Sequence, residues 1–592
     1  MGQTGRGVLL AGHTALALVV AAALAVPLSL LLLWRYRRAV LAAMRRSARH
    51  DSAGTSPHDT ASPAPSHAPH GHIEITVRDS AHPSACAGAA AQIVRGALLG
   101  PWRLALVYTI AALGQAIVIA AAWRLKSATP VVHAVTLVNT WIYFWPGLLI
   151  VGIALSGSVR TWAALVAAYL TAFLLLVGLA FADGGMALLM LGAWGQIVLP
   201  PTLVLLPFLH RRLRAVGPLV LAALLLASAG ALAILKLAVD AAVGPGSAPD
   251  PEASYWIEVL ALAAGFMLFG AAGWQAVGWL GRRYRAKRFG DQSLVLDLIA
   301  LIFSLYQSAV LSGTLWALAG PVSFGVFKLL SVAGFALARR RDGDRSNVKL
   351  LLLRVFGNPR RSERLMTQVG VRWRHVGSIQ LIAGTDLVTS TVTPHDFLEF
   401  AGGRLAQRYI ADRQDLDRRL TSQDLAPDPD GRYRVNEFFC YSNTWQATVA
   451  RVAVEADAVL MDLREFSAER QGCAFEIGAL VQRVRLDKVV FIVNQSTDLT
   501  LLRATLERAC AAITAESPNA AARTRVTLIR TDREGRANTR LLLASLATAA
   551  TQAANNNTNR SSGHSGAPDA APERHHGRTR RAHDHEQTGA QL

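Results

Sequence analysis

The chain has 592 residues, 52% of them hydrophobic, and a formal net charge of +20. A positive charge of this size is common in nucleic-acid-binding proteins, but here many arginines stand in short clusters at the ends of apolar runs, as in Arg282, Arg283 and Arg285. Membrane topology explains that placement, so a lipid bilayer is the expected partner and nucleic acid is not. The four cysteines form no Cys-x-x-Cys pair, which fits a reducing compartment and gives no reason to expect a metal site.

The first apolar run, from Val8 to Trp34, is long enough to cross a hydrocarbon core of about 30 Å. It is long for a signal peptide, and basic residues follow it where a small-residue cleavage site would stand. We therefore expect residues 1–34 to hold a retained transmembrane helix with a periplasmic N-terminus. Residues 35–101 are expected to be a basic segment and a disordered cytoplasmic linker, because residues 48–72 are rich in Ser, Pro, Ala and His. Ile73 to Val77 fits a short strand or a lead-in without an assigned role.

Residues 102–338 are expected to form an eight-helix transmembrane domain, which gives nine spans in all. Small residues and tryptophans are scattered through the runs, as is typical of closely packed helices with aromatic rings at the interfaces. The prolines at 200 and 201 should kink the span that contains them. The expected spans of this domain are 104–123, 131–155, 161–182, 186–209, 216–243, 255–280, 293–317 and 321–338.

The charges of the loops predict the orientation. If the residues after Ala338 are cytoplasmic, the inner loops of this block carry nine basic residues and the outer loops carry only Arg124 and Lys126. Such a bias is the one that the positive-inside rule requires. We therefore expect a multi-pass protein of a bacterial inner membrane, with the N-terminus outside and the C-terminal part in the cytoplasm.

Several polar side chains fall inside the expected spans, where they are costly unless they are paired or near an interface. Lys236 and Asp240 stand four residues apart and suit an intrahelical pair, and Asp297 is expected near the cytoplasmic interface. No internal repeat or pair of broken helices indicates a transporter. The polar residues concerned are Gln115, His133, Asn139, Lys236, Asp240, Gln275, Asp297, Gln307 and Lys328.

After a basic junction at 339–346, residues 347–550 change character, and short apolar runs alternate with helical patterns. This alternation predicts a cytosolic, doubly wound α/β domain with a mostly parallel sheet. Residues 551–592 are rich in Asn, Ser, Gly and His and are expected to be a disordered tail. The expected strands are 348–356, 378–383, 433–440, 458–463, 488–494 and 525–530. The expected helices are 362–375, 394–420, 444–455, 474–484, 499–513 and a closing helix to about Thr548.

The sharpest chemical signal lies in residues 457–478. A strand is expected to end at Asp462, a polar loop with Ser467 follows, and a helix begins near Gly472 with Glu476 in its first turns. Ligands of a doubly wound sheet bind beyond the carboxyl ends of its strands. These polar side chains are therefore expected at or near one binding edge.

The motif formed by Asp462-Leu463 and by Gly472-Cys-Ala-Phe-Glu-Ile-Gly478 resembles the core motif of the nucleoside deoxyribosyltransferase-like superfamily. It is also similar, more loosely, to the strand, serine loop and Cys-x-x-Glu helix of bacterial Toll/interleukin-receptor (TIR) domains. The resemblance implies a flavodoxin-like architecture, a catalytic role for Glu476 on an N-glycosidic bond, and ligand-binding roles for Asp462, Ser467 and Cys473. The segment 412–432 belongs to neither pattern.

A carboxylate against a ribosyl ring can attack its anomeric carbon or stabilise an oxocarbenium-like centre. The simpler explanation is that Glu476 is a first-turn glutamate favoured by the helix dipole and that Cys473 is a small core residue. The predicted function is a membrane protein with a nucleotide-sensing or nucleotide-cleaving cytosolic domain. An inactive signalling module and a transporter with a regulatory domain remain alternatives. No resident cofactor is expected, NAD or another nucleotide would be substrate or ligand, and a homo-oligomer is left open.

Overall fold

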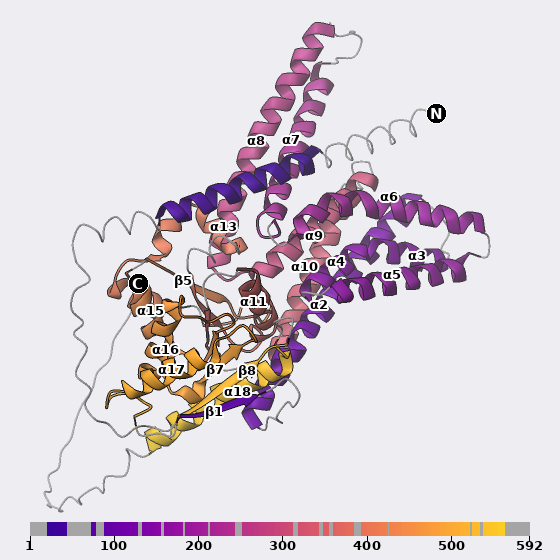
Figure 1. The fold of residues 1–592 in the computed structure, drawn as a ribbon. Coiled ribbons are helices and arrows are strands. Elements are labelled where there is room, and N and C mark those ends of the chain that lie inside the picture. The colour runs from indigo at the N-terminus through magenta and orange to yellow at the C-terminus, as the bar shows by residue number, and fades with distance from the viewer. Residues whose placement is uncertain are drawn as a thin grey trace, which may run out of the picture.

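The structure is a computed structural model that combines a bundle of long helices with an α/β domain packed against one end of the bundle (Figure 1). It describes residues 20–43, 73–78, 88–127, 133–155, 159–181, 184–210, 213–242, 251–311, 318–342, 347–354, 359–383, 392–423, 425–441, 443–520, 524–532 and 537–562.

The bundle contains a helix at each of the nine positions where the sequence predicts a span. Seven of these described helices are long and apolar enough to cross a membrane, and the bent pair α3–α4 would make an eighth. These apolar helices agree with a multi-pass membrane protein, whereas the count of nine spans stays a prediction. The helices are Val20–Ala43, α2 (Gly88–Ser127), α3 (His133–Tyr143), α4 (Trp145–Ala154), α5 (Val159–Ala180), α6 (Gly184–Leu209), α7 (Gly217–Ala242), α8 (Pro251–Arg285), α9 (Asp291–Leu311) and α10 (Ala319–Asp342).

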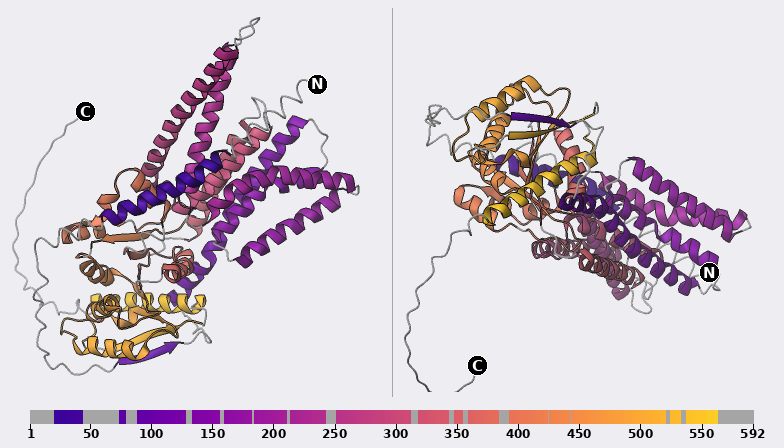
Figure 2. Two further views of the ribbon diagram at one scale, coloured as in Figure 1. Left: turned by 45° about the horizontal axis from the view of Figure 1, so that its top comes forward. Right: turned by 90° about the horizontal axis from the view of Figure 1, so that it is seen from below.

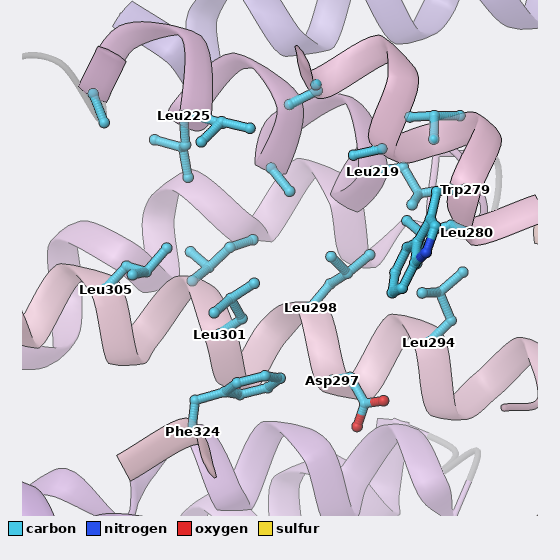
Figure 3. Close-up of a pocket in the computed structure, with 18 of the residues that line it drawn as sticks. Leu219, Leu225, Trp279, Leu280, Leu294, Asp297, Leu298, Leu301, Leu305 and Phe324 are labelled. Atoms are coloured by element: carbon cyan, nitrogen blue, oxygen red, sulfur yellow. The ribbon is translucent and has the colours of Figure 1, made fainter. Parts of the chain in front are cut away.

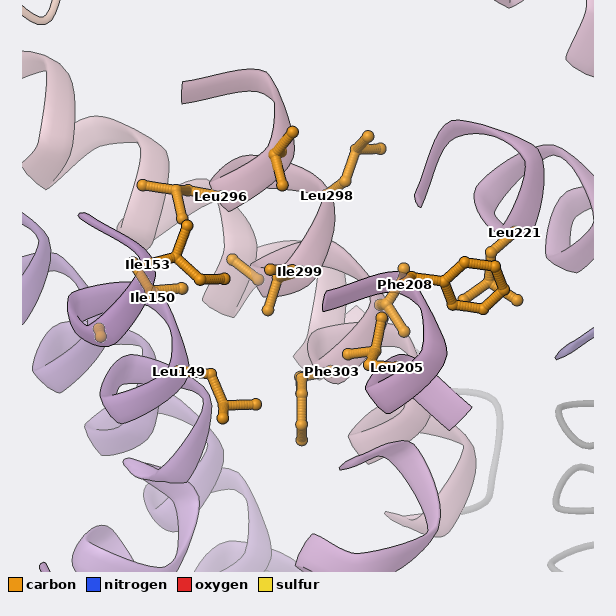
Figure 4. Close-up of a cluster of buried hydrophobic side chains, with 14 of the residues drawn as sticks. Leu149, Ile150, Ile153, Leu205, Phe208, Leu221, Leu296, Leu298, Ile299 and Phe303 are labelled. Carbon is orange, nitrogen blue, oxygen red and sulfur yellow. The ribbon is translucent and has the colours of Figure 1, made fainter. Parts of the chain in front are cut away.

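Large apolar side chains on the outside of the bundle fit lipid rather than water. Leu175 is 61% exposed, Met267 is 74% exposed and Leu329 is 68% exposed. So large an apolar surface is unusual on a soluble monomer. In the bundle's interior, Ile299 and Phe303 of α9 pack against Leu149 of α4, and side chains of α6 complete the cluster (Figure 4). Helix α9 therefore lies in the interior of the bundle, where it packs against α10, α4, α7, α2 and α6.

The α/β domain contains an eight-stranded sheet in which every strand pair is parallel, in the order β1-β8-β7-β6-β2-β3-β5-β4. Seven of the strands come from the predicted domain. The strands are β1 (Ile73–Arg78), β2 (Leu350–Arg354), β3 (Ile379–Ala383), β4 (Tyr409–Ile410), β5 (Val435–Cys440), β6 (Ala458–Asp462), β7 (Val489–Val493) and β8 (Thr524–Arg530).

Helices cover both faces of the sheet, as the continuous apolar strands require. Side chains alternate between the faces, so Leu350 and Leu352 join one apolar cluster whereas Leu351 and Leu353 join the other. The first cluster includes α11 (Pro359–Trp373) and α18 (Thr539–Ser562). The second includes α14 (Arg413–Thr421), α15 (Trp445–Glu455), α16 (Gln471–Arg483) and α17 (Leu499–Ala511).

The boundaries predicted for residues 35–101 are wrong at both ends, although the short strand suggested for residues 73–77 is confirmed. The first helix does not end at Trp34 but continues to Ala43, because Tyr36 and Val40 are fully buried against the α/β domain. Residues 73–78 form β1, which lies beside β8 at the edge of the sheet. Most of the predicted disordered linker, residues 48–72, lies outside the described residues.

Helix α2 also begins earlier than predicted, at Gly88 rather than near residue 102. Its 40 residues extend for about 60 Å, twice the thickness of a hydrocarbon core. The first turns therefore stand outside the lipid and pack against the end of α11. A Cβ at Gly96 would lie 2.8 Å from Val376 Cγ1, and one at Gly100 would overlap the ring of His375. The two glycines, four residues apart, permit this close approach.

The predicted helix 394–420 is also wrong, because four short elements replace it: α13 (Pro394–Ala401), the 3-10 helix η2 (Leu405–Arg408), β4 and α14. Helix α13 begins with a capping box between Thr393 and Asp396 and is capped by Gly402. Gly403 has a φ of +71°, which ends the helical path. Strand β4 then pairs with β5, and α14 begins after Asp412 caps its first turn. Helix α18 runs to Ser562, beyond the predicted end near Thr548, so residues 551–562 are not a disordered tail.

The ends of the helices place the basic turns next to the α/β domain. The turn between α8 and α9 contacts that domain directly, whereas the far ends of α7 and α8 lie away from it (Figure 2). Gln292 Nε2 at the start of α9 donates to the carbonyl of Ile153 at the end of α4, over 2.8 Å. The α4 end therefore lies on this side too, as the loop charges predicted.

Candidate functional site

The centre of the sheet contains the topological switch point of the α/β domain. From β2 the chain builds β3, β4 and β5 on one side of the sheet, and β6 then begins the half that contains β7 and β8. The register pairs Arg354 with Asp462 at the carboxyl ends of β2 and β6. Ligands of open α/β sheets bind in the crevice outside such a point. The carboxyl end of β6 is therefore the candidate ligand site.

Asp462 is held at this edge by a buried ion pair. The Arg464 Nε atom donates to Asp462 Oδ1 over 2.7 Å, and Arg464 Nη2 donates to Oδ2 over 2.5 Å. Both side chains are 6% exposed. Two parallel charge-assisted bonds of this kind fix orientation as well as charge. Asp462, predicted as a ligand-binding residue, is thus engaged by an arginine of its own loop.

The loop after β6 is tied to the loop after β7. The backbone N–H of Glu465 donates to Asn494 Oδ1 over 3.2 Å, and Thr497 Oγ donates to the carbonyl of Leu463 over 3.0 Å. Glu465 has a φ of +66°, an uncommon conformation for a residue with a side chain. Ser467 lies half-buried in the same loop. Two neighbouring loops at the carboxyl edge therefore form one hydrogen-bonded unit.

Helix α16, which follows this loop, carries the two remaining predicted residues. Cys473 and Glu476 are each 2% exposed, and with Leu480 they form the buried stripe of the helix. The sulfur lies in the apolar cluster beneath the sheet, which suits a core residue. The structure thus brings Asp462 and Ser467 to one loop, whereas Cys473 packs in the core.

Glu476 is not the solvated first-turn glutamate of the simpler explanation. Helix α16 begins at Gln471 and has no acidic residue in its first turn. The stabilisation of acidic residues by the helix dipole falls off within that turn. A carboxylate on the buried face of a helix is costly in an otherwise apolar stripe. The helix dipole alone therefore does not explain its presence there.

A second cluster of polar residues joins the two parts of the molecule. We call it the junction: the α8–α9 turn, residues 284–292, in contact with α13 and with residues 426–434. Arg285 Nη1 donates to Glu399 Oε1 over 2.7 Å. The ring of Tyr284 stacks on His395 with centroids 4.7 Å apart, and Arg434 Cζ lies 4.0 Å from the centroid of the Tyr284 ring.

At the centre of the junction lies Arg432, which is 4% exposed. Its guanidinium pairs with Asp430, with Nη2 at 2.5 Å from Oδ2, and donates to Gln292 Oε1 at the start of α9. Burial alone would raise the pKa of Asp430, but Arg432 outweighs that effect and holds the pKa below its usual value. The charged groups of Arg432 and Asp430 and the side-chain amide of Gln292, at the start of a membrane helix, are thus buried together.

The junction also constrains the titration of His395. Burial, and then the positive charge of Arg408, lower the pKa of His395 below its usual value, against the opposing carboxylates of Asp396, Asp291 and Glu399. A histidine that is buried against other cations stays neutral at physiological pH. Its ring can therefore stack on Tyr284 without adding a third positive charge beside Arg408 and Arg434.

Sequence reasoning missed the junction because no motif connects its three segments, and one of them, residues 426–434, lies in the segment 412–432 and just beyond it. The available signal was a charged residue at every second position from Asp428 to Arg434, with two acids followed by two bases. This spacing of opposite charges in a loop predicts local pairing, and Arg434 Nε does donate to Asp428 Oδ1 over 2.8 Å. It does not predict the partner in the membrane helices.

Two polar residues that were singled out in the spans form an ion pair. Lys328 of α10 binds the carboxylate of Asp297 in α9. Gln115 of α2 donates to Ser304 Oγ of α9 over 2.7 Å. Both contacts satisfy polar groups inside the bundle, as the cost of burying them in lipid requires. The side chains of Lys236 and Asp240 lie outside the described residues, so their pairing stays a prediction.

Comparison with known proteins adds no relative: no protein-family model, no curated protein and no solved structure matches this chain. The fold and its contacts define the class, a chain with membrane-length apolar helices and a parallel α/β domain joined through a buried polar interface. Among the described residues, no group of three or more His, Cys, Asp or Glu side chains could hold a metal ion.

Proposed function

We propose that this chain is a multi-pass membrane protein whose α/β domain binds a nucleotide at the carboxyl end of β6 and transmits its occupancy to the bundle through the junction. The observation that carries the proposal is the switch point, where the paired ends of β2 and β6 lie next to the loop of Asp462, Arg464 and Ser467. Nucleotides are frequent ligands of such crevices. The junction supplies the mechanical connection, because it buries side chains from both parts.

The proposed site of action is a bacterial inner membrane, with nine spans and the α/β domain in the cytoplasm. Strand β1 precedes α2 and the later spans but pairs with β8, so the chain before α2 and the chain after α10 both lie on the side of the α/β domain. The basic residues of the α8–α9 turn lie on that side as well. Because basic loops stay cytoplasmic, this side is assigned to the cytoplasm.

Substitution of Asp462 by asparagine tests the proposed site. A carboxylate has about four acceptor positions, and Arg464 uses three of them, two through its guanidinium and one through its backbone N–H, which leaves one for a ribose hydroxyl. We expect Asp462→Asn to weaken the binding of NAD, ATP or a nucleoside to the full-length protein in detergent by about 10-fold or more, equivalent to about 1.4 kcal/mol. Equilibrium binding with each of these ligands is the measurement.

The matched control is Asp487→Asn, which breaks a similar pair, Arg485 with Asp487, at the amino end of β7. It should leave nucleotide binding unchanged. Equal effects of the two substitutions, or no binding of any nucleotide to the unmodified protein, would remove the proposal.

A second candidate function is the cleavage of an N-glycosidic bond, and the buried Glu476 favours it. The carboxylate would act as nucleophile or electrostatic stabiliser at the anomeric carbon of the ribosyl ring. Since Glu476 is 2% exposed, a ribosyl ring reaches it only when the residues that cover it move aside. Cleavage therefore requires an opening that simple binding at the edge does not.

Substitution of Glu476 by glutamine separates cleavage from binding. We expect Glu476→Gln to keep nucleotide affinity and to lose the release of nicotinamide or free base by at least about 100-fold, the scale for removing an essential carboxyl group. Glu469→Gln, an exposed change in the same loop, should keep full turnover. If both variants and the unmodified protein release base at the same rate, Glu476 is not catalytic.

A further inference from the structure

A large apolar groove lies between the α7–α8 hairpin and the α9–α10 pair. Its volume is about 1080 Å³, above the roughly 300–1,000 Å³ of common small-molecule pockets. Figure 3 shows leucines of α9, among them Leu298 and Leu301, facing Leu225 of α7 and Trp279 of α8 across this space. The walls are almost entirely aliphatic and aromatic. A hydrocarbon chain is the natural occupant of such a space in a bilayer.

The mouth of the groove is basic. Arg283, in the last turn of α8, and Arg288, in the α8–α9 turn, both line the groove and are exposed. The guanidinium of Arg283 lies 5.2 Å from the centroid of the Trp279 ring. Within the described part of the chain no carboxylate pairs with either arginine. Two guanidinium groups beside an interfacial tryptophan form a site for a phosphate at the membrane surface.

The single acid that lines the groove does not oppose this charge. Asp297 is bound by Lys328, so the pair contributes no net charge to the groove. The arginines at the mouth and the apolar walls are therefore the features that select an occupant. The arginines lie at the membrane surface and the apolar walls lie deeper in the bilayer. An anionic lipid has the same arrangement, with a charged headgroup above its hydrocarbon chains.

We propose that this groove binds an anionic phospholipid of the leaflet next to the α/β domain, with its acyl chains between the α7–α8 hairpin and α9 and its phosphate at Arg283 and Arg288. The same turn of α8 carries Tyr284 and Arg285, which contact His395 and Glu399 in the junction. The lipid therefore lies within one helical turn of the contacts that hold the α/β domain. It is a regulator of the junction as well as a ligand.

The test is the retention of lipid by the purified full-length protein. The protein is incubated with mixed micelles that contain equal amounts of phosphatidylglycerol and phosphatidylcholine, and bound lipid is counted by native mass spectrometry. Because basic side chains near a membrane surface each attract anionic lipid, we expect a preference for phosphatidylglycerol of about 10-fold, and its loss in the double variant Arg283→Gln/Arg288→Gln.

Two further variants make the result specific. Arg339→Gln/Arg340→Gln removes two exposed arginines that do not line the groove, and it should keep the preference. Ala229→Phe keeps both arginines but fills the groove, and it should reduce the binding of both lipids. The proposal is overturned if phosphatidylcholine binds equally well, if the 283/288 and 339/340 pairs behave alike, or if Ala229→Phe retains as much lipid as the unmodified protein.

Discussion

Replacement of Arg432 by methionine is expected to lower the thermal unfolding temperature of the full-length protein by several degrees and to open the junction to protease. The substitution leaves Asp430 as a buried carboxylate without its main partner and also removes the hydrogen bond to Gln292. Breaking one half of a buried ion pair costs about 3–5 kcal/mol. The measurement is thermal unfolding in detergent, with limited proteolysis as the second readout.

The pH dependence of this loss follows from Asp430. In the unmodified protein its lowered pKa adds stability above the ordinary carboxyl range, and that stability is lost as pH falls through the folded-state pKa. Without Arg432, burial raises the pKa of Asp430 instead. The variant is therefore less stable at neutral pH, where the buried carboxylate is charged, and its stability increases as the carboxyl is protonated. The difference in stability between the two proteins should therefore shrink toward about pH 4, near the usual pKa of Asp.

Arg418→Met is the control for this prediction. Arg418 pairs with Asp415 over 3.5 Å, but its side chain is 69% exposed. Exposed pairs contribute at most about 1 kcal/mol, so this variant should unfold close to the temperature of the unmodified protein. If Arg432→Met lowers the unfolding temperature no more than Arg418→Met does, the junction does not hold the bundle and the α/β domain together.

The second large effect is expected when the α/β domain is produced alone. A fragment of residues 347–562 lacks the first helix, β1 and the first turns of α2. Their removal uncovers an apolar face that includes Val376 and leaves β8 as an open edge. Exposed apolar faces and unprotected edge strands promote aggregation. We expect this fragment to be largely insoluble or to bind a hydrophobic dye.

A second fragment serves as the comparison: residues 73–101 joined by a flexible linker to 347–562. It restores the strand and the buried Ala97 of α2. It should be more soluble and should unfold at a higher temperature. Size-exclusion chromatography and thermal unfolding measure both properties. A monomeric 347–562 fragment that unfolds cooperatively at the same temperature as the longer fragment would contradict the prediction.

The sequence predicted the strands and helices of the α/β domain well because their signals are local. The run Val489–Val493 is apolar throughout, as a strand buried on both faces must be, and its position is confirmed. The polar loop between Asp462 and α16 also lies where the motif placed it. Periodicity and strand composition are properties of neighbouring residues, so a single sequence carries them.

Features that depend on distant residues could not be predicted in this way. Nothing in the residues 73–78 identifies β8 as their partner. The rings of Tyr36 and Phe400, whose centroids are 5.5 Å apart, likewise belong to segments that are remote in the chain. The helix predicted at 394–420 failed for a local reason, because Gly402 caps α13 and Gly403 adopts a φ of +71°, which a helix does not continue through.

The pairing of β1 with β8 has a consequence for biosynthesis. Ile73 leaves the ribosome about 450 residues before Thr524, a delay of roughly 20–90 s at ordinary elongation rates of about 5–20 residues per second. During that interval every helix from α2 to α10 is delivered to the translocation machinery while β1 has no neighbouring strand. The sheet is therefore completed only after these helices have been made, and the pairing of β1 with β8 closes the polypeptide into a ring that contains all of them.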